Sequence, residues 1–346
     1  MPGCIIGTMQ SSAQRCGGLG SAGGTLHTFS IIAKELSQVR ALIERELLDC
    51  SKPVRDLAGY IAAVKGKMIR PGLLLLSGLV CGRITERHIR GGGIVEMIHN
   101  ATLLHDDVVD EGTTRRGAAT LNHMRGNESA VLLGDFLLSR VFRLCVELDT
   151  KAAATIASAA VRTCEGELRQ TAQRGNWHLS ESQYFEIITE KTAALFSGAC
   201  SLGAMLAGGS ERQVRILADY GRNTGIAFQI TDDLLDLTGV EARTGKSVGN
   251  DLEHDKLTLP LIHFFNSAGK KEKAAARRLI NHPRSSSKRA IFSLAKILRE
   301  NGSIEYAQRR VEKFVKQAIK SLGGLKNSEG KNALIETARF VAGRTV

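Results

Sequence analysis

Proline placement is the sequence feature that most restricts the fold of this 346-residue chain. Only five prolines occur, and none lies between Pro71 and Pro260. Proline lacks a backbone donor and collides with the preceding helical turn, so a long proline-free stretch rich in Ala and Leu favours helices. Runs of Val, Ile and Tyr bounded by turn residues, the usual sign of strands, are scarce. We therefore predict an all-α protein.

Apolar residues that recur at helical spacing divide the chain into segments. The predicted helices cover residues 29–49, 73–81, 88–110, 129–147, 152–174, 180–206 and 211–237, with further amphipathic helices over 259–344. The glycine triplet 91–93 falls near the start of one of them and predicts a local loop. No change in composition marks a second domain, so we expect one domain over residues 29–346.

Residues 1–28 are rich in Gly and Ser and predict a flexible leader. They carry one charged residue, Arg15, and lack the basic start and apolar run of a secretory signal. The seven cysteines are scattered without a CxxC pair, which indicates reduced thiols in a cytosol-like compartment. We expect a cytoplasmic protein, and import into an organelle through residues 1–28 stays open.

Positive charge is concentrated in the C-terminal part of the chain. From Asn266 onward, 19 Lys and Arg stand against 6 Glu, a net charge of +13, whereas the whole chain carries +12. Such a segment is either a solvated outer helix face or a surface that contacts an anionic membrane. The interspersed bases favour the solvated face, and peripheral membrane contact is the alternative. We expect no nucleic-acid partner.

The pattern Asp-Asp-x-x-Asp occurs twice, each time near the end of a predicted helix. One copy runs from Asp106 to Asp110 and the other from Asp232 to Asp236. On a helix, the first and last carboxylates of each copy share a face and repel each other. Acids near a helix C-terminus also face the unfavourable end of the helix dipole. Two such clusters are costly unless cations neutralise them.

Carboxylates in this arrangement point to Mg²⁺, Mn²⁺ or Ca²⁺, which prefer hard oxygen ligands. A few protein carboxylates combined with a phosphate ligand favour Mg²⁺. A single copy would equally suit a solvated acidic helix end, but two copies within apolar sequence argue against it. Basic residues suited to phosphate contact bracket both copies. They are Lys67, Arg70, Arg115, Arg116, Lys246 and Lys256.

With these residues the chain resembles the trans-isoprenyl diphosphate synthase family from about Phe29 to Val346. The resemblance rests on both aspartate-rich motifs, on Gly66-Lys67-Met68-Ile69-Arg70-Pro71, on the pair Lys191-Thr192, and on the late lysines Lys246 and Lys256. It implies one large helical bundle around a central cavity, and Mg²⁺-dependent joining of isopentenyl diphosphate to an allylic diphosphate. It also implies a homodimer.

The resemblance assigns a role to each candidate residue. Mg²⁺ would be held by Asp106, Asp110, Asp232 and Asp236, with Asp107 and Asp233 as weaker ligand candidates. The allylic diphosphate would contact Arg115, Lys191, Lys246 and Lys256. Isopentenyl diphosphate would contact Lys67, Arg70, His99 and Arg116. Thr192 and Gln229 would direct oxygen dipoles at the developing allylic cation.

Product length depends, in this family, on side chains one turn before the first aspartate-rich motif. Here these are Ala101 and Thr102, where short-chain relatives tend to carry an aromatic residue. The small side chains predict a long-chain product, for which a quinone side chain is a natural use. Many relatives also have a glycine directly before the second late lysine, where this chain has Asp255.

Three alternatives stay open at this point. The first is a short-chain synthase that stops at farnesyl or geranylgeranyl diphosphate. The second is a class I terpene cyclase, although such enzymes usually carry a different second metal motif. The third is a non-catalytic partner subunit of a heteromeric synthase, which should have lost one or both acidic clusters.

Overall fold

The structure is a computed structural model that describes residues 27–63, 66–115, 117–238, 249–280 and 288–343. The predicted leader therefore lies almost wholly outside the described residues, as do Arg116 and Lys246. The division into a leader and one synthase domain stays a prediction.

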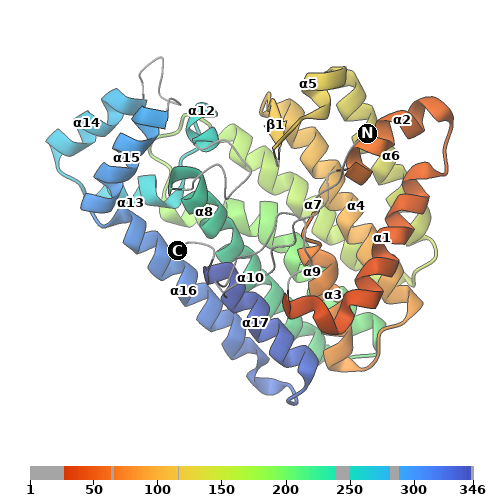
Figure 1. Ribbon diagram of the computed structural model, residues 1–346. Helices are drawn as coiled ribbons and strands as arrows, with labels where there is room; N and C mark the ends of the chain where they lie inside the picture. Colours follow the sequence, from red (N-terminus) through yellow and green to blue (C-terminus); the bar gives the residue numbers. More distant parts are fainter. Residues whose placement is uncertain (1–26, 64–65, 116, 239–248, 281–287, 344–346) are drawn as a thin grey trace, which may run out of the picture.

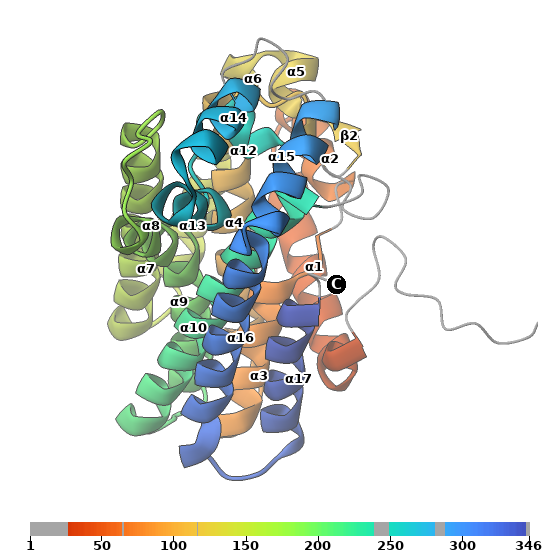
Figure 2. The ribbon, with the colours of Figure 1, turned by 90° about the vertical axis from the view of Figure 1, so that its left-hand side faces the viewer.

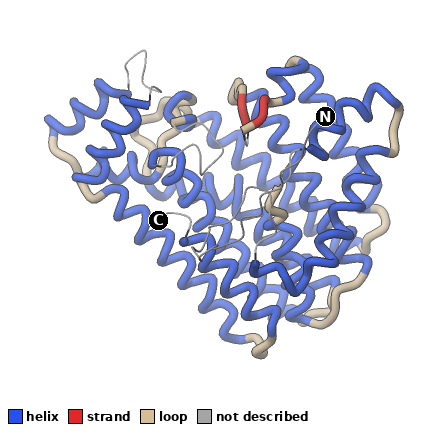
Figure 3. Tube along the Cα trace, viewed as in Figure 1, coloured by secondary structure: helices blue, strands red, loops and turns tan. Residues whose placement is uncertain are grey.

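Helices account for nearly all of the described chain, which confirms the all-α prediction (Figure 3). The first half contains η1 (His27–Ile32), α1 (Ala33–Leu48), α2 (Lys52–Ala63), α3 (Ile69–Cys81), α4 (Glu86–Val109), α5 (Leu121–Arg125), α6 (Asn127–Cys145) and α7 (Thr150–Ala172). The second half contains α8 (Glu181–Ile188), η2 (Thr189–Ala193), α9 (Ala194–Leu206), α10 (Glu211–Thr238), α12 (Asn250–Glu253), α13 (Leu259–Ser267), α14 (Lys270–Ile280), α15 (Lys288–Glu300), α16 (Ser303–Ser321), η3 (Leu322–Gly324) and α17 (Glu329–Gly343). The strands β1 (Thr114–Arg115) and β2 (Ala118–Ala119) form a short antiparallel hairpin.

The uncharged helix α9 lies at the centre of the bundle, in contact with α3, α4, α7 and α10 (Figure 1). Its sequence ALFSGACSLGAML is apolar or small on every side, and most of it is buried. A helix that is hydrophobic all round needs neighbours on all faces, which these four helices supply. Among the described helices, none is long and apolar enough to cross a bilayer.

The glycine triplet 91–93 lies inside α4, so the predicted loop at this point is wrong. A Cβ atom at Gly92 would lie 3.0 Å from Val39 Cγ2, and one at Gly93 would lie 2.9 Å from Leu42 Cδ2. The triplet therefore allows α1 to pack closely on α4. Buried apolar contacts with α1 and its neighbours stabilise a helix that glycine propensity alone would disfavour.

The C-terminal helices form one side of the molecule (Figure 2). The long helix α16 packs along α10, and α17 packs against both α16 and α3. The shorter helices α14 and α15 lie side by side at one end of α16, near α12 (Figures 1 and 2). This arrangement places the basic part of the sequence beside the end of α10 that carries the second acidic motif.

Candidate active site

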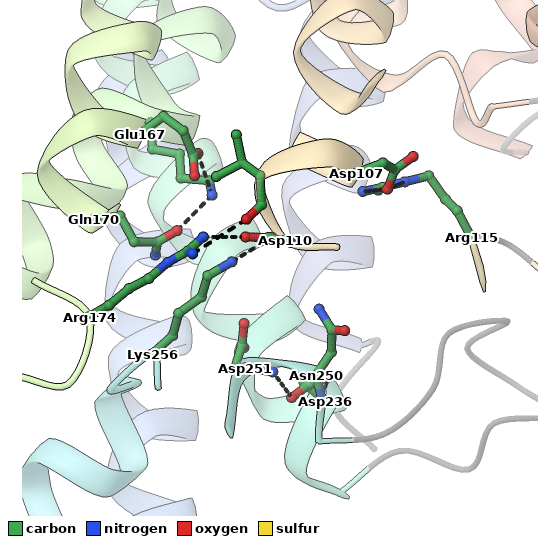
Figure 4. A network of polar contacts seen from close by, with 12 residues as sticks. Asp107, Asp110, Arg115, Glu167, Gln170, Arg174, Asp236, Asn250, Asp251 and Lys256 are labelled. Carbon is green, nitrogen blue, oxygen red and sulfur yellow. Dashed lines mark hydrogen bonds and ion pairs between the residues drawn. The ribbon is translucent and has the colours of Figure 1, made fainter. Parts of the chain in front are cut away.

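The first acidic motif occupies the last turns of α4, as predicted. The Asp110 carboxylate is held between two cations: Lys256 Nζ lies 2.6 Å from Oδ2, and Arg174 pairs with Oδ1 (Figure 4). Burial alone would raise the pKa of Asp110, but the charge and hydrogen bond of Lys256 hold that pKa below its usual value. The cations thus relieve the repulsion that two acids one turn apart would create.

Asp106 lies one turn earlier in a more strongly desolvated position. Burial raises the pKa of Asp106 to about 6, against the lowering influence of Lys191. The Lys191 ammonium lies 2.5 Å from Glu167 Oε2 and donates to Gln170 Oε1 at 2.7 Å. Burial alone would lower the pKa of Lys191, but Asp106 and Glu167 raise it. Lys191 therefore stays charged beside the first motif.

The turn that presents Lys191 and Thr192 is a π-helix, η2, between α8 and α9. The predicted helix over 180–206 is present, and the π-turn within it was not predicted. A Cβ atom at Gly166 of α7 would lie only 2.1 Å from the backbone nitrogen of Lys191. On the opposite side, a Cβ atom at Gly225 of α10 would lie 2.6 Å from Ala193 Cα. The two glycines let α7 and α10 clamp the turn, and π-turns of this kind are frequent at functional sites.

A chain of hydrogen bonds orients Thr192 and Gln229. Thr192 Oγ1 donates to Gln229 Oε1 at 2.6 Å, and Gln229 Nε2 donates to Asp233 Oδ1 at 2.8 Å. The buried hydroxyl of Tyr184 donates to the other Asp233 oxygen at 2.6 Å. Burial raises the pKa of Asp233 to about 7, while these two donors favour its charged form. Asp233 thus anchors the amide of Gln229 through direct hydrogen bonds.

The second motif ends at Asp236, whose carboxylate caps the short helix α12. The backbone N–H groups of Asn250 and Asp251 each donate to it at 3.1 Å (Figure 4). The backbone oxygen of Asp251 in turn accepts a hydrogen bond from the backbone N–H of Lys256 at 2.8 Å. Because the Lys256 side chain reaches Asp110, one short segment connects the two acidic motifs. The sequence placed Lys256 near the site, and the structure supplies this connection.

The residue before Lys256 adopts a left-handed conformation. Asp255 has φ of 51°, where a side chain is strained and glycine is favoured. This accounts physically for the glycine that many relatives carry at this position. The backbone oxygen of Asp255 accepts from the Gly175 nitrogen at 3.0 Å, and Lys256 still reaches Asp110. The departure from the family pattern therefore leaves the lysine in place.

The middle aspartate of the first motif, Asp107, pairs with an arginine of the β1–β2 hairpin that follows it. Asp107 is buried, and Arg115 of β1 lies 2.6 Å from its Oδ1. Asn122 also donates to the Asp107 backbone oxygen at 3.0 Å. Burial alone would lower the pKa of Arg115, but Asp107 raises it. Arg115 lies beside the first motif, as predicted, with Asp107 as its partner.

The residues expected to hold isopentenyl diphosphate lie at the start of α3 and on α4. The Arg70 guanidinium lies 4.8 Å from the ring centre of Phe196, which packs on Phe228, the neighbour of Gln229 in sequence. Lys67 is exposed, with its ammonium 5.8 Å from the Phe340 ring. His99 is half-buried on α4. Arg116 and Lys246 fall outside the described residues, so their roles stay predictions.

The predicted length-determining residues lie on α4, below the first motif. Ala101 is 1% exposed, and Thr102 is half-buried with its hydroxyl donating to the His99 backbone oxygen at 2.8 Å. Met97 and Ile98, in the turn below, are buried as well. A larger side chain at Ala101 would therefore enter the packed interior rather than solvent.

Four further residues surround the site and were not predicted from the sequence. Glu167, Gln170 and Arg174 belong to α7 or its C-terminal end, and Tyr184 belongs to α8. The spacing of Glu167, Gln170 and Arg174 at i, i+3 and i+7 marks one polar helix face, which was an available signal. Nothing in the sequence pairs Arg174 with Asp110, because 64 positions separate them.

The donor set fits a hard divalent cation. The motifs offer carboxylate oxygens, while Arg174, Lys191 and Lys256 lie beside the first motif and can pair with phosphate. Within the part of the chain that the structure describes, no three acidic, His or Cys side chains converge on one point suited to a metal.

Comparison with known proteins identifies the family. The sequence profile described as polyprenyl synthetase matches residues 51–298, which is more than half of the chain. The chain belongs to the polyprenyl synthetase family. The octaprenyl diphosphate synthase of Haemophilus influenzae is 38% identical over 286 residues, covering 82% of this chain and 86% of that protein. The family also contains a short chain isoprenyl diphosphate synthase, from Methanothermobacter thermautotrophicus, that is 33% identical over 82% of this chain and 88% of that protein.

Solved structures of family members share the fold. A polyprenyl synthase from Caulobacter crescentus, complexed with calcium and isoprenyl diphosphate, superposes with a TM-score of 0.88. It is 31% identical, and the match covers 94% of this chain and all of that chain. A decaprenyl diphosphate synthase from Rhodobacter capsulatus has a TM-score of 0.84 at 33% identity, covering 92% and 98% of the two chains. These matches confirm the predicted helical bundle of the isoprenoid synthase type.

Proposed function

We propose that this prenyltransferase condenses isopentenyl diphosphate with allylic diphosphates to make a long all-trans polyprenyl diphosphate, releasing pyrophosphate at each step. One observation carries the proposal. The two acidic motifs are joined by the segment 249–256, and three cations, Arg174, Lys191 and Lys256, lie beside the first of them. Such a combination of carboxylates and bases suits a metal-bound diphosphate far better than a neutral substrate.

Magnesium is the proposed cofactor, with Asp106, Asp110, Asp232 and Asp236 as its protein ligands. A bound divalent ion supplies positive charge that stabilises the departing diphosphate. The related Caulobacter crescentus structure is complexed with calcium, which supports a divalent cation as the cofactor. In this chain, Lys256 and Arg174 form ion pairs with the carboxylate of Asp110. They would exchange that carboxylate for phosphate oxygens when substrate binds.

The first chemical event is cleavage of the bond between C1 of the allylic substrate and its diphosphate oxygen. The electron pair leaves with pyrophosphate, and an allylic cation remains. Lys191, Lys256 and Arg174 offer hydrogen bonds to the charge that grows on the leaving group. The hydrogen-bonded Thr192 and Gln229 lie next to Lys191 and orient side-chain oxygens that stabilise the cation. Their fixed positions avoid reorganisation during the reaction.

The second event is attack by the double bond of isopentenyl diphosphate on the allylic cation. A new carbon–carbon bond forms, and loss of a proton restores a double bond. The departing pyrophosphate takes this proton, so no side-chain base is required. Lys67, Arg70, His99 and Arg116 are the proposed contacts for the second diphosphate. Holding both substrates in line supplies much of the rate enhancement.

The long product is supported by the residues of α4 below the first motif. Ala101 and Thr102 are small, so neither places an aromatic ring across the path of the growing chain. The octaprenyl and decaprenyl diphosphate synthases among the relatives are long-chain enzymes by name. A short-chain relative at 33% identity shows that overall similarity does not separate the two product classes. The residues at positions 101 and 102 therefore carry this part of the proposal.

A homodimer is the proposed assembly. Large apolar side chains are exposed on α6 and α7, where a second copy of the chain would cover them. They include Val131, Leu132, Phe142, Val161 and Leu168, of which Phe142 and Leu168 are about 70% exposed. Light scattering on the wild type and on Phe142→Glu checks this assembly. A wild type that is monomeric at micromolar concentration would contradict it.

Consumption of isopentenyl diphosphate tests the proposed function. The wild type with Mg²⁺ and farnesyl diphosphate should incorporate it, whereas Asp106→Ala and Asp232→Ala should lose most turnover while remaining folded. A terpene cyclase would convert farnesyl diphosphate without incorporation, and a non-catalytic subunit would do neither. Activity within a few-fold of the wild type in either variant would refute the metal assignment.

A further inference from the structure

The helices α14 and α15 expose a dense group of bases beside the active site. The exposed members, which we call the α14–α15 basic surface, are Lys270, Lys271, Arg277, Arg278, Arg289, Lys296 and Arg299. Only two acidic residues, Glu272 and Glu300, lie in these two helices. Glu272 accepts a hydrogen bond from the Gly269 nitrogen, so it caps the start of α14. Glu300 Oε1 lies 3.8 Å from Lys296 Nζ. Seven exposed bases against two acids leave the surface strongly positive.

An aromatic side chain lies within this surface. Phe292 of α15 is 73% exposed. On the helix it shares one face with Arg289, Lys296 and Arg299, at offsets of −3, +4 and +7. The opposite face of α15 packs its apolar residues into the core. A helix with an exposed aromatic among bases is suited to the boundary between lipid headgroups and acyl chains.

The buried face of α15 touches the segment that orients the second acidic motif. A Cβ atom at Gly249 would lie 2.1 Å from Ile291 Cδ1, so backbone and side chain are in direct contact. The Gly249 nitrogen donates to the Asp236 backbone oxygen at 2.9 Å. Ile291 is the sequence neighbour of Phe292. The basic surface and the segment beside Asp236 therefore lie on opposite sides of one helix.

We propose that the α14–α15 basic surface docks the protein on an anionic lipid bilayer, with Phe292 entering the headgroup boundary. The inference rests on the proposed long-chain product, because a long polyprenyl chain partitions into lipid far better than into water. Docking would hold the protein at the lipid phase that takes up the released product. Charge complementarity selects anionic over neutral lipid. Each base near such a surface strengthens binding about fivefold.

Vesicle binding of the full chain tests the proposal. Co-sedimentation is measured with vesicles of phosphatidylcholine alone and with an added fraction of phosphatidylglycerol, at low and high salt. The wild type should bind only the anionic vesicles, and less at high salt. The triple variant Arg289→Gln/Lys296→Gln/Arg299→Gln should bind on the order of 100-fold more weakly. Phe292→Ser should lose about tenfold or more.

A matched triple variant on α16 separates this surface from general charge. Lys313, Lys316 and Lys320 are exposed bases of α16. Changing all three to Gln should weaken binding by less than tenfold. An equal loss in both triple variants would overturn the proposal, as would equal recovery on neutral and anionic vesicles. Release of the wild type from anionic vesicles by RNA at equal phosphate concentration would assign the surface to nucleic acid instead.

A vesicle-free activity assay keeps this inference separate from the proposed function. The first condensation, with farnesyl diphosphate as soluble primer, should proceed at wild-type rate within about twofold in both triple variants. An inactive wild type that still binds anionic vesicles would refute the proposed function alone. An active wild type that does not bind anionic vesicles would refute the docking surface alone.

Discussion

Gly166 offers a sharp test of how the fold positions Lys191. In Gly166→Ala the new methyl group would lie 2.1 Å from the backbone nitrogen of Lys191 and 2.5 Å from its Cα if nothing moved. Ordinary contact requires about 3.4 Å, so the π-turn must move by roughly 1.3 Å or α7 must retreat. Overpacking of this kind costs about 1–3 kcal/mol of stability. Misplacement by about 1 Å can lower a rate on the order of 100-fold.

The assay compares initial rates of isopentenyl diphosphate incorporation, normalised to folded protein measured by circular dichroism. We expect turnover to fall by about 100-fold while the variant remains folded. Gly59→Ala in α2 is the matched control, because nothing lies within 4 Å of the new methyl group. That control should keep its activity and gain about 0.5–1 kcal/mol. A folded Gly166→Ala variant within threefold of the wild-type rate would refute the reasoning.

Three further substitutions probe the site. The native pKa of Asp106 is about 6 against an ordinary 3.8, so the unprotonated carboxylate destabilises the metal-free fold as pH rises between these values. Asp106→Asn should therefore raise the melting temperature near pH 7.5, by the equivalent of at most about 3 kcal/mol, with no gain near pH 4. Lys256→Gln should lower turnover by about 10²–10³-fold, and a loss below threefold in initial rate would count against its role. Ala101→Phe should shorten the product seen by mass spectrometry, and an active variant with unchanged products would contradict the role of that position.

The helical class and the acidic motifs were predictable because they depend on local sequence. The proline-free stretch between Pro71 and Pro260 and the apolar periodicity predict the helices. The spacing in each Asp-Asp-x-x-Asp pattern places two carboxylates on one helix face. The structure adds why the middle aspartates differ from their neighbours. Asp107 forms an ion pair with Arg115, and Asp233 accepts hydrogen bonds from Tyr184 and Gln229. Those partners are set by packing between helices and were not predictable from spacing.

The features missed from the sequence share a tertiary origin. The π-turn at Thr189–Ala193 exists because α7 and α10 clamp it at glycines, which local propensity does not reveal. The triplet 91–93 is helical because α1 packs on it, against its own intrinsic preference. The pairing of Arg174 with Asp110 joins the end of α7 to the end of α4. Each depends on neighbours distant in sequence.

The length of the wild-type product decides whether this protein is a long-chain synthase. The protein is incubated with Mg²⁺, farnesyl diphosphate and excess isopentenyl diphosphate, and the products are resolved by mass spectrometry. We expect all-trans polyprenyl diphosphates longer than geranylgeranyl diphosphate. Products that stop at geranylgeranyl diphosphate, with excess isopentenyl diphosphate remaining, would contradict it.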